Sequence, residues 1–266
     1  MTFPCMLVRG SGDVASAVSA RLFQNGYAVV IHDLEQPTVT RRSMSFADAI
    51  FDGHASLEGV EAQLIQDPAL LPGLLAAHEI LPITTLAFEI LINELRPAVL
   101  VDARMNKHAQ PENQRHLAAL TVGLGPNFVA GETVHLAIET GRGESLGQVI
   151  EQGPTLELEG EPAPIAGHSR DRYVYAPSAG IFRTSHRIGD MVEQGQELAR
   201  LGESILCAPI SGVLRGLTHD GVQVELKTKL IEVDPRSVDA QISGIAERPA
   251  RIAQGVLQAF RERGYR

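Results

Sequence analysis

The sequence predicts an α/β protein in which a mostly parallel sheet is followed by a small all-β domain and a C-terminal helix. Short apolar runs alternate with helical patterns through residues 4–122, as expected of a parallel sheet with helices on both faces. An eight-residue segment starting at Ala176 recurs at Ala208, which indicates a β-rich internal repeat. Residues 251–263 carry apolar side chains at helical spacing, and we expect this helix to pack on the first domain or to mediate dimerisation.

A glycine loop lies between the first two expected strands. Gly10, Gly12 and Ala15 occupy the small positions of the dinucleotide-type pattern Gly-x-Gly-x-x-Ala. Asp33 ends the second strand at the distance of a ribose-binding carboxylate. The helix after the loop would offer free amides to a phosphate, although Asp13 adds a negative charge there. The loop predicts a Rossmann-like half, and the alternative is a glycine turn that binds nothing. The predicted cofactor contacts are Gly10, Ser11, Gly12, Asp13, Val14 and Asp33.

Charged residues follow other strands, at the edge where ligands bind to parallel sheets. Arg41 and Arg42 follow the second strand, and we expect them either to contact a phosphate or to pair with Glu35 or Asp48. A basic segment follows the apolar run 98–102, and a second glycine-rich loop follows the run 119–122. The alternatives for these two segments are an Asp–Arg pair that closes a loop and a simple turn. The predicted contacts in them are Asp102, Arg104, Lys107, Gly123, Gly125 and Asn127.

Two hairpins are expected beside the parallel strands. Residues 55–65 are extended around Glu58-Gly59, which is a turn sequence. Residues 132–151 alternate polar and apolar side chains, so that His135 and Glu139 share a face. A structural role is more common than a catalytic one for such residues, and no catalytic residue is assigned.

Composition narrows the class of protein. The chain has 266 residues, which suggests two domains. A net charge of −9 and a pI near 5.5 argue against nucleic-acid and anionic-membrane partners. Without a long apolar run or a signal peptide, a cytoplasmic protein is expected. Cys5 and Cys207 form neither a disulfide framework nor a zinc site by spacing, so no metal site is expected.

The internal repeat organises the second domain. The offset of 32 residues also relates Gly189 to Gly221, Val192 to Val224 and Leu198 to Leu230. Residues 189–196 and 208–213 resemble the biotinyl/lipoyl-like barrel-sandwich family. The connection 199–207 lacks the lysine that carrier domains modify, so the resemblance implies a rigid packing or partner-binding module. The predicted boundaries are 1–151 for the Rossmann-like domain, 152–167 for a linker, 168–238 for the barrel-sandwich domain and 239–266 for a C-terminal helical segment.

The motifs in their order along the chain resemble a bacterial family of accessory proteins of the selenium-dependent molybdenum hydroxylase system, the YqeB-type proteins, which are distantly similar to XdhC-like maturation factors. The segments that carry the resemblance are Val8 to Ser16, Gln36-Pro37, Arg41 to Ala47, Val101 to Met105, Gly123 to Phe128 and Ile138 to Gly143.

This resemblance implies a maturation factor for a molybdenum hydroxylase. Such a factor would bind a phosphate-bearing cofactor, either molybdopterin-type or a nucleotide, and would have the apo-hydroxylase as its partner. Two alternatives remain open. One is an NAD(P)-dependent oxidoreductase, although no hydride-transfer constellation is present. The other is a non-catalytic scaffold.

Overall fold

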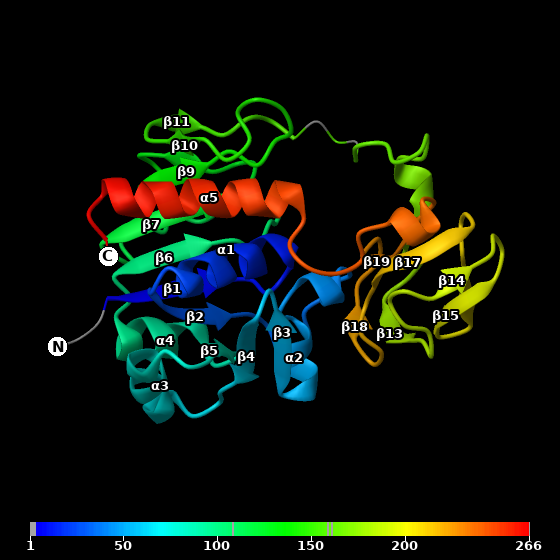
Figure 1. Cartoon of the computed structure of the whole chain (residues 1–266), viewed down its shortest axis with the longest axis horizontal. Helices are drawn as coiled ribbons and strands as arrows, with labels where there is room; N and C mark the ends of the chain where they lie inside the picture. The colour runs from blue at the N-terminus through cyan, green and yellow to red at the C-terminus, as the bar shows by residue number, and fades with distance from the viewer. Residues whose placement is uncertain (1–3, 108, 159, 161, 266) are drawn as a thin grey trace.

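The computed structural model describes residues 4–107, 109–158, 160 and 162–265. Its larger unit is built on a nine-stranded sheet in the order β10-β9-β7-β6-β1-β2-β5-β4-β3 (Figure 1). The strands from β9 to β4 run parallel, and β10 and β3 are antiparallel at the two edges. The strands are β1 (Cys5–Arg9), β2 (Ala28–His32), β3 (His54–Leu57), β4 (Val60–Leu64), β5 (Leu81–Thr84), β6 (Val99–Asp102), β7 (Leu120–Leu124), β9 (Leu136–Ile138) and β10 (Val149–Ile150).

Helices cover both faces of this sheet. Met6 and Val8 of β1 pack in the apolar cluster that includes α1 and α5, whereas Cys5 and Leu7 pack in the cluster that includes α3 and α4. This alternation follows from the two-residue period of a strand. The helices are α1 (Asp13–Gln24), α2 (Asp48–Asp52), α3 (Leu71–Ala77), α4 (Phe88–Leu95) and α5 (Glu247–Glu262), with the 3₁₀ turns η1 (Arg42–Met44), η2 (Pro68–Leu70), η3 (Arg170–Arg172) and η4 (Ser237–Asp239). A small separate sheet pairs β8 (Val129–Ala130) with β11 (Gly153–Pro154).

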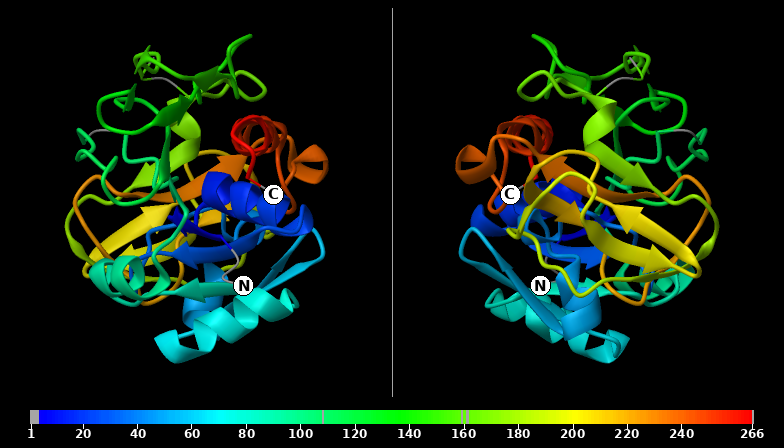
Figure 2. Two further views of the ribbon diagram at one scale, coloured as in Figure 1. Left: turned by 90° about the vertical axis from the view of Figure 1, so that its left-hand side faces the viewer. Right: turned by 90° about the vertical axis from the view of Figure 1, so that its right-hand side faces the viewer.

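The C-terminal helix returns to the first unit. Figures 1 and 2 show α5 beside α1, and Ile252, Val256 and Phe260 are fully buried in their shared cluster. Burying each such side chain contributes about 1.5–3 kcal/mol. Gly255 allows the close approach of the loop before β10, because a Cβ there would lie 2.0 Å from the carbonyl oxygen of Gly147. Packing on the first unit is thus confirmed, and the apolar face of this helix is already covered.

The second unit consists of two four-stranded antiparallel sheets, in the orders β12-β19-β17-β14 and β16-β15-β13-β18. Their inner faces share one apolar core that includes Phe182, Leu201, Leu214 and Val233. The strands are β12 (Tyr173–Tyr175), β13 (Gly180–Arg183), β14 (Met191–Val192), β15 (Glu197–Leu201), β16 (Ser204–Cys207), β17 (Gly212–Leu217), β18 (Gln223–Val224) and β19 (Lys229–Asp234).

The repeated sequence segments form equivalent strands. β13, β14 and β15 of the first copy correspond to β17, β18 and β19 of the second. β13 pairs with β15 as β17 pairs with β19, and each copy's middle strand pairs with the other copy. Gly180 and Gly212, at matching positions, have nearly equal φ angles of 159° and 157°. The internal repeat is therefore a structural repeat.

The predicted fold class needs correction. The structure is a large mixed sheet with an antiparallel strand at each edge, followed by two antiparallel sheets, and it does not clearly match a Rossmann-like domain joined to a lipoyl-like barrel-sandwich. The regular alternation of strand and helix stops after β6, because residues 103–107 and 109–119 form no helix before β7. The two edge strands belong to hairpins, which pair antiparallel by construction. The predicted domain boundaries stay a prediction.

The two units are joined by specific contacts. The amide of Leu217 donates to the carbonyl oxygen of Thr40 at 2.8 Å, and the Arg42 Nε donates to the Leu217 carbonyl oxygen at 2.8 Å. The ring of Phe51 stacks on that of His219 with centroids 4.1 Å apart. The segment after β2 is thus held on β17, which fixes the position of Arg41 between the units.

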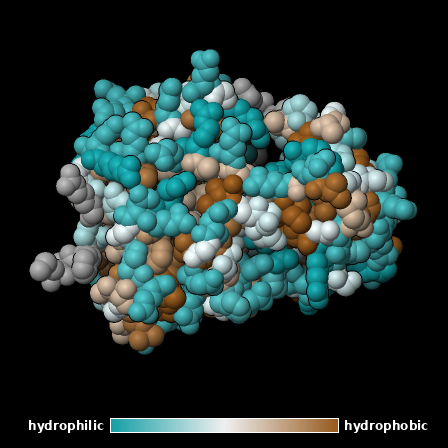
Figure 3. Space-filling view, viewed as in Figure 1, coloured by the Kyte–Doolittle hydropathy of each residue, from teal (hydrophilic) through white to brown (hydrophobic). Residues whose placement is uncertain are grey.

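Hydrophilic side chains cover most of the face seen in Figure 3, and the apolar residues on it form small separate patches. Within the part of the chain that the structure describes, no helix is long and apolar enough to cross a membrane.

Candidate functional site between the two units

The glycine loop is closed by carboxylates of the chain itself. Gly10 has a φ of 105° and lies against the loop after β6, where a Cβ would be 3.0 Å from the Ala103 carbonyl oxygen. The amide and the hydroxyl of Ser11 both donate to Asp33 Oδ2, at 2.7 and 2.6 Å. The amide of Val14 donates to Asp13 Oδ1 at 3.0 Å. Two amides that the sequence assigned to a phosphate therefore hold acidic side chains instead.

The basic segment after β6 is also paired internally. Arg104 donates from Nε and Nη2 to the two oxygens of Asp102, at 3.0 and 2.6 Å, and Nη2 lies 3.1 Å from Glu112. Gln114 donates a further bond of 2.6 Å to Asp102. The structure therefore shows the Asp–Arg pair that closes a loop, which was the alternative to ligand binding.

The second glycine loop, after β7, packs against the ring of Phe128 and positions the segment that carries Lys107. A Cβ on Gly123 would lie 2.3 Å from the ring of Phe128, so glycine is required there. Gly125 has a φ of 116°. The amide of the Asn127 side chain donates to the carbonyl oxygens of Lys107 and Ala109, at 3.2 and 3.1 Å. The loop after β7 thereby holds the segment that carries Lys107.

His135 and Glu139 have structural partners. His135 Nδ1 lies 2.9 Å from the Thr121 hydroxyl. Glu139 is buried and accepts bonds from the amides of Thr140, Gly141 and Leu156. Among the described residues, no group of three or more His, Cys, Asp or Glu side chains is arranged to hold a metal ion.

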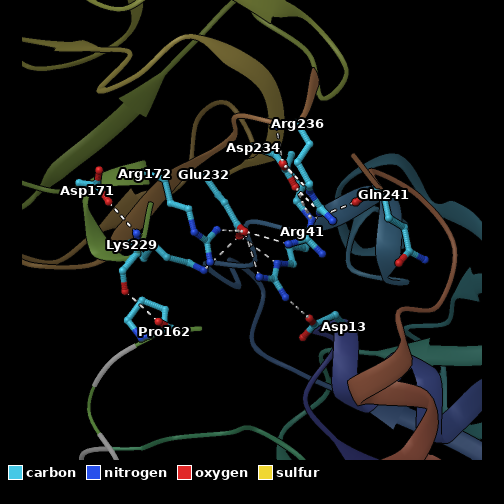
Figure 4. A network of polar contacts seen from close by, with 12 residues as sticks. Asp13, Arg41, Pro162, Asp171, Arg172, Lys229, Glu232, Asp234, Arg236 and Gln241 are labelled. Atoms are coloured by element: carbon cyan, nitrogen blue, oxygen red, sulfur yellow. Dashed lines mark hydrogen bonds and ion pairs between the residues drawn. The ribbon is translucent and has the colours of Figure 1, made fainter. Parts of the chain in front are cut away.

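A buried ion cluster joins the two units around Glu232 of β19 (Figure 4). Arg41 donates from Nε and Nη2 to the two oxygens of Glu232, at 2.9 and 3.0 Å. Arg172 and Arg215 donate to Oε1 of the same carboxylate, at 2.5 and 3.1 Å. Burial alone would raise the pKa of Glu232, but the charges of Arg41 and Lys229 outweigh it and hold the pKa well below its usual range. The remaining arm of Arg41 pairs with Asp13 at the start of α1, 3.0 Å away.

The charge of Asp13 raises the pKa of three further cations, Lys107, Lys229 and Arg248, and the charge of Arg142 lowers the pKa of Lys107 and of Arg248. We call Lys107, Arg142, Lys229 and Arg248 the cationic site. Arg248 donates to the Thr140 carbonyl oxygen at 3.0 and 2.9 Å. Lys107 and Arg142 have no side-chain hydrogen bond or ion pair with any residue that the structure describes. Lys107 and Arg142 are therefore positive charges of the cationic site that no described carboxylate pairs with.

The pKa values of Lys107, Lys229 and Asp13 are shifted by burial and by the charges around them. Desolvation, followed by the charge of Arg248, lowers the pKa of Lys107. Burial lowers the pKa of Lys229 to about 8; Glu232 opposes this shift, and the charge of Arg41 adds to it. Burial would raise the pKa of Asp13, yet Arg41 and then Lys229 and Arg248 lower it. Asp13 is the carboxylate whose charge acts on Lys107, Lys229 and Arg248 alike.

Of the residues predicted from sequence, Asp13, Arg41 and Lys107 come together here. Arg42 instead pairs with Asp48 at 2.7 Å, which is the alternative that the sequence left open. No sequence pattern pointed to the other members of the site, which lie far away along the chain: Lys229, Glu232, Arg172, Arg215 and Arg248. One signal was available: only three of the 23 lysines and arginines are lysines, at positions 107, 227 and 229. Two of these three lie in the cationic site.

Comparisons with known proteins give one relative that matches nearly the whole chain and several solved structures with low sequence identity. No family model matches the sequence. The chain is 38% identical over 255 residues to the "Uncharacterized protein YqeB" of Escherichia coli K12, covering 96% of this chain and 47% of that protein. It thus spans about half the length of this curated relative.

Similar solved structures include a succinylglutamate desuccinylase/aspartoacylase from Rhodobacter sphaeroides, with 15% identity over 87% of this chain and 85% of that one. They also include the ectoine utilization protein EutE (DoeB) from Ruegeria pomeroyi in its product-bound form, with 13% identity and the same two shares. The TM-score is 0.25 in both cases, so neither similarity carries a conclusion about this chain.

These results correct the function expected from sequence. The name of the Escherichia coli relative mentions no molybdenum enzyme, selenium enzyme or hydroxylase partner. The loop amides and the arginines assigned to a phosphate-bearing cofactor are bound to carboxylates of this chain. The same geometry argues against the NAD(P)-dependent oxidoreductase, because Asp33 accepts from Ser11, and nothing supports the scaffold alternative. Kinship with the YqeB-type accessory proteins stays a prediction.

Proposed function

We propose that this chain binds a small molecule with two or more carboxylate groups at the cationic site between its two units. The observation that carries this proposal is that the Asp13 carboxylate, which already pairs with Arg41 at 3.0 Å, is also the carboxylate whose charge acts on Lys107, Lys229 and Arg248. Like charges in a partly desolvated site raise one another's energy, and a bound anion removes that cost. The protein as a whole carries −9, so this positive site is a local exception.

The arrangement favours carboxylates over a phosphate. A phosphate at a helix start is usually held by backbone amides, and here the loop amides of Ser11 and Val14 are taken. The cations come from separate segments: the loop after β6, the turn after β9, strand β19 and helix α5. Positive charges spread in this way match a ligand whose negative charges lie on separate groups.

Titration calorimetry of the full chain tests the proposal. Citrate serves as the tricarboxylate probe, with inorganic phosphate and acetate for comparison. We expect citrate to bind more tightly than either. Lys107→Gln should weaken citrate binding about tenfold, which corresponds to about 1.4 kcal/mol.

The matched control is Lys227→Gln, which removes the same charge from an exposed position outside the site. It should leave the affinity unchanged. The proposal is overturned if Lys107→Gln and Lys227→Gln lose affinity equally, or if phosphate binds as tightly as citrate.

A further inference from the structure

The second copy of the repeat forms the face on which the first unit docks. The amide of Leu217 donates to the Thr40 carbonyl oxygen at 2.8 Å. Glu232 accepts from the Nε of Arg41 at 2.9 Å. Thr40 and Arg41 lie in the loop segment after β2, outside any helix or strand. This face therefore binds two successive loop residues, the first through a backbone hydrogen bond and the second through an ion pair.

The equivalent face of the first copy is open. Ser185 and Arg200 stand 32 residues before Leu217 and Glu232, and both line a surface hollow of about 450 Å³. Neither the amide nor the carbonyl oxygen of Ser185 has a hydrogen-bond partner in the part of the chain that the structure describes. The described residues that line the hollow all belong to the second unit. The first unit thus covers one copy and leaves the matching face of the other exposed.

Like charges lie opposite each other in this hollow. Arg183 of β13 and Arg200 of β15 are direct partners in register, and their side chains are 61% and 57% exposed. Arg183 pairs with Asp220 at 3.3 Å and Arg200 with Glu197 at 2.7 Å, but such exposed pairs are weak and exchange readily. Like charges opposite each other on neighbouring strands are unfavourable, and an anion between them removes that cost. The second copy has a glutamate at the position of Arg200, and that glutamate binds an arginine, so the charges are reversed between the two faces.

We propose that this face binds an acidic loop segment of a partner protein. The segment is the charge-reversed counterpart of the one that docks on the second copy. One of its carbonyl oxygens accepts from the Ser185 amide, and the carboxylate of its next residue lies between Arg183 and Arg200. The face shares no residue with the cationic site, so this inference is independent of the proposed function.

Two labelled peptides test the proposal by fluorescence anisotropy with the full chain. One has the native sequence of residues 37–44, and the other carries Arg41→Glu within that sequence. We expect the Arg41→Glu peptide to bind about tenfold more tightly than the native peptide. Equal binding of the two peptides, or binding of neither, overturns the proposal.

Variants of the chain locate the binding face. Arg200→Gln should remove the preference for the acidic peptide, and Arg200→Glu should reverse it. The control is Arg21→Glu, which makes the same change in net charge at an exposed position of α1 and should keep the preference. A preference that survives Arg200→Glu overturns the proposal. A dimer of the native chain that Arg200→Glu dissociates, as measured by sedimentation, would give the face to a second copy and overturn it as well.

Discussion

The two copies of the internal repeat place a lysine or arginine and a glutamate at the same positions but in opposite order. In the first copy, Glu197 and Arg200 of β15 form a pair at 2.7 Å, with side chains 47% and 57% exposed. In the second, 32 residues on, Lys229 and Glu232 of β19 are 33% and 0% exposed. The same strand position therefore carries a surface pair in one copy and part of a buried cluster in the other.

This difference shows that the surroundings, rather than the strand, decide the chemistry of the pair. The first copy faces solvent, where an ion pair is screened and weak. The second copy faces the first unit, whose Arg41 reaches over to Glu232. Arg183 and Arg215 differ in the same way, with 61% and 8% of the side chain exposed. Substitutions at matching positions of the two copies test this contrast.

Glu232→Gln should have the largest effect. It leaves Arg41, Arg172 and Arg215 without their shared carboxylate in a buried site, and breaking a buried pair costs about 3–5 kcal/mol in unfolding free energy. Urea denaturation of the variant measures the loss. Arg200→Gln, at the matching position of the first copy, should unfold like the native chain. A similar loss of unfolding free energy in both variants would show that the two copies do not differ in the strength of this interaction.

Arg215→Gln should have the next largest effect. Arg215 donates to Glu232 at 3.1 Å and to the Gln241 carbonyl oxygen at 2.9 Å, and losing a buried hydrogen bond to a charged group costs about 1.5–3 kcal/mol. Arg183→Gln removes only an exposed pair of 3.3 Å with Asp220 and should cost less than about 1 kcal/mol. Thermal and urea unfolding measure the loss of unfolding free energy in the two variants. A larger loss in Arg183→Gln than in Arg215→Gln would contradict the contrast between the copies.

The pH dependence of stability should separate Lys229 from Lys227. The pKa of Lys229 falls from 10.5 to about 8 in the folded chain. Between these two values the unfolded state still binds a proton that the folded state has lost, so unfolding free energy rises with pH there. Lys229→Gln should show a smaller rise than the native chain, because only the lowered pKa of Lys107 then contributes, and Lys227→Gln should keep the full rise. Urea midpoints measured at pH 7, 8, 9 and 10 check the prediction, and identical profiles for the two variants would contradict it.

Glu197→Gln should have the smallest effect. Its partner Arg200 is exposed, and salt screens such a pair. The melting temperature should match that of the native chain at both low and high salt. A lower melting temperature at low salt that returns to the native value at high salt would show that the Glu197–Arg200 pair is stronger than expected of an exposed pair.

Part of the fold could be predicted because its signals are local. The turn sequence Glu58-Gly59 joins β3 and β4, with φ angles of 50° and 75°, and the second hairpin also forms. Gly10 has the positive φ that its loop requires. The offset of 32 residues between the two copies correctly related β13, β14 and β15 to β17, β18 and β19. The full order of the nine strands could not be predicted, because the pairing of distant strands leaves no fixed spacing in the chain.

The candidate site was less predictable. Arg41 and Lys107 were selected because they follow strands, and Asp13 because it lies in the glycine loop, but the expected ligand was a phosphate-bearing cofactor. Their actual neighbours include Glu232, which is 191 residues from Arg41. Nothing in the spacing of β19 distinguishes its lysine and glutamate from the matching pair of β15.

The sequence by itself determined the local conformations: the glycine turns, the alternating faces of the strands, the two hairpins and the two copies of the repeat. It also determined that lysine is scarce, which makes each lysine worth locating. Only the tertiary structure decided which copy is buried, which carboxylates accept from the loop amides and which three arginines share Glu232 with Lys229. The physical reason is that charge interactions and desolvation depend on distance through space, and that distance is set when the two units dock.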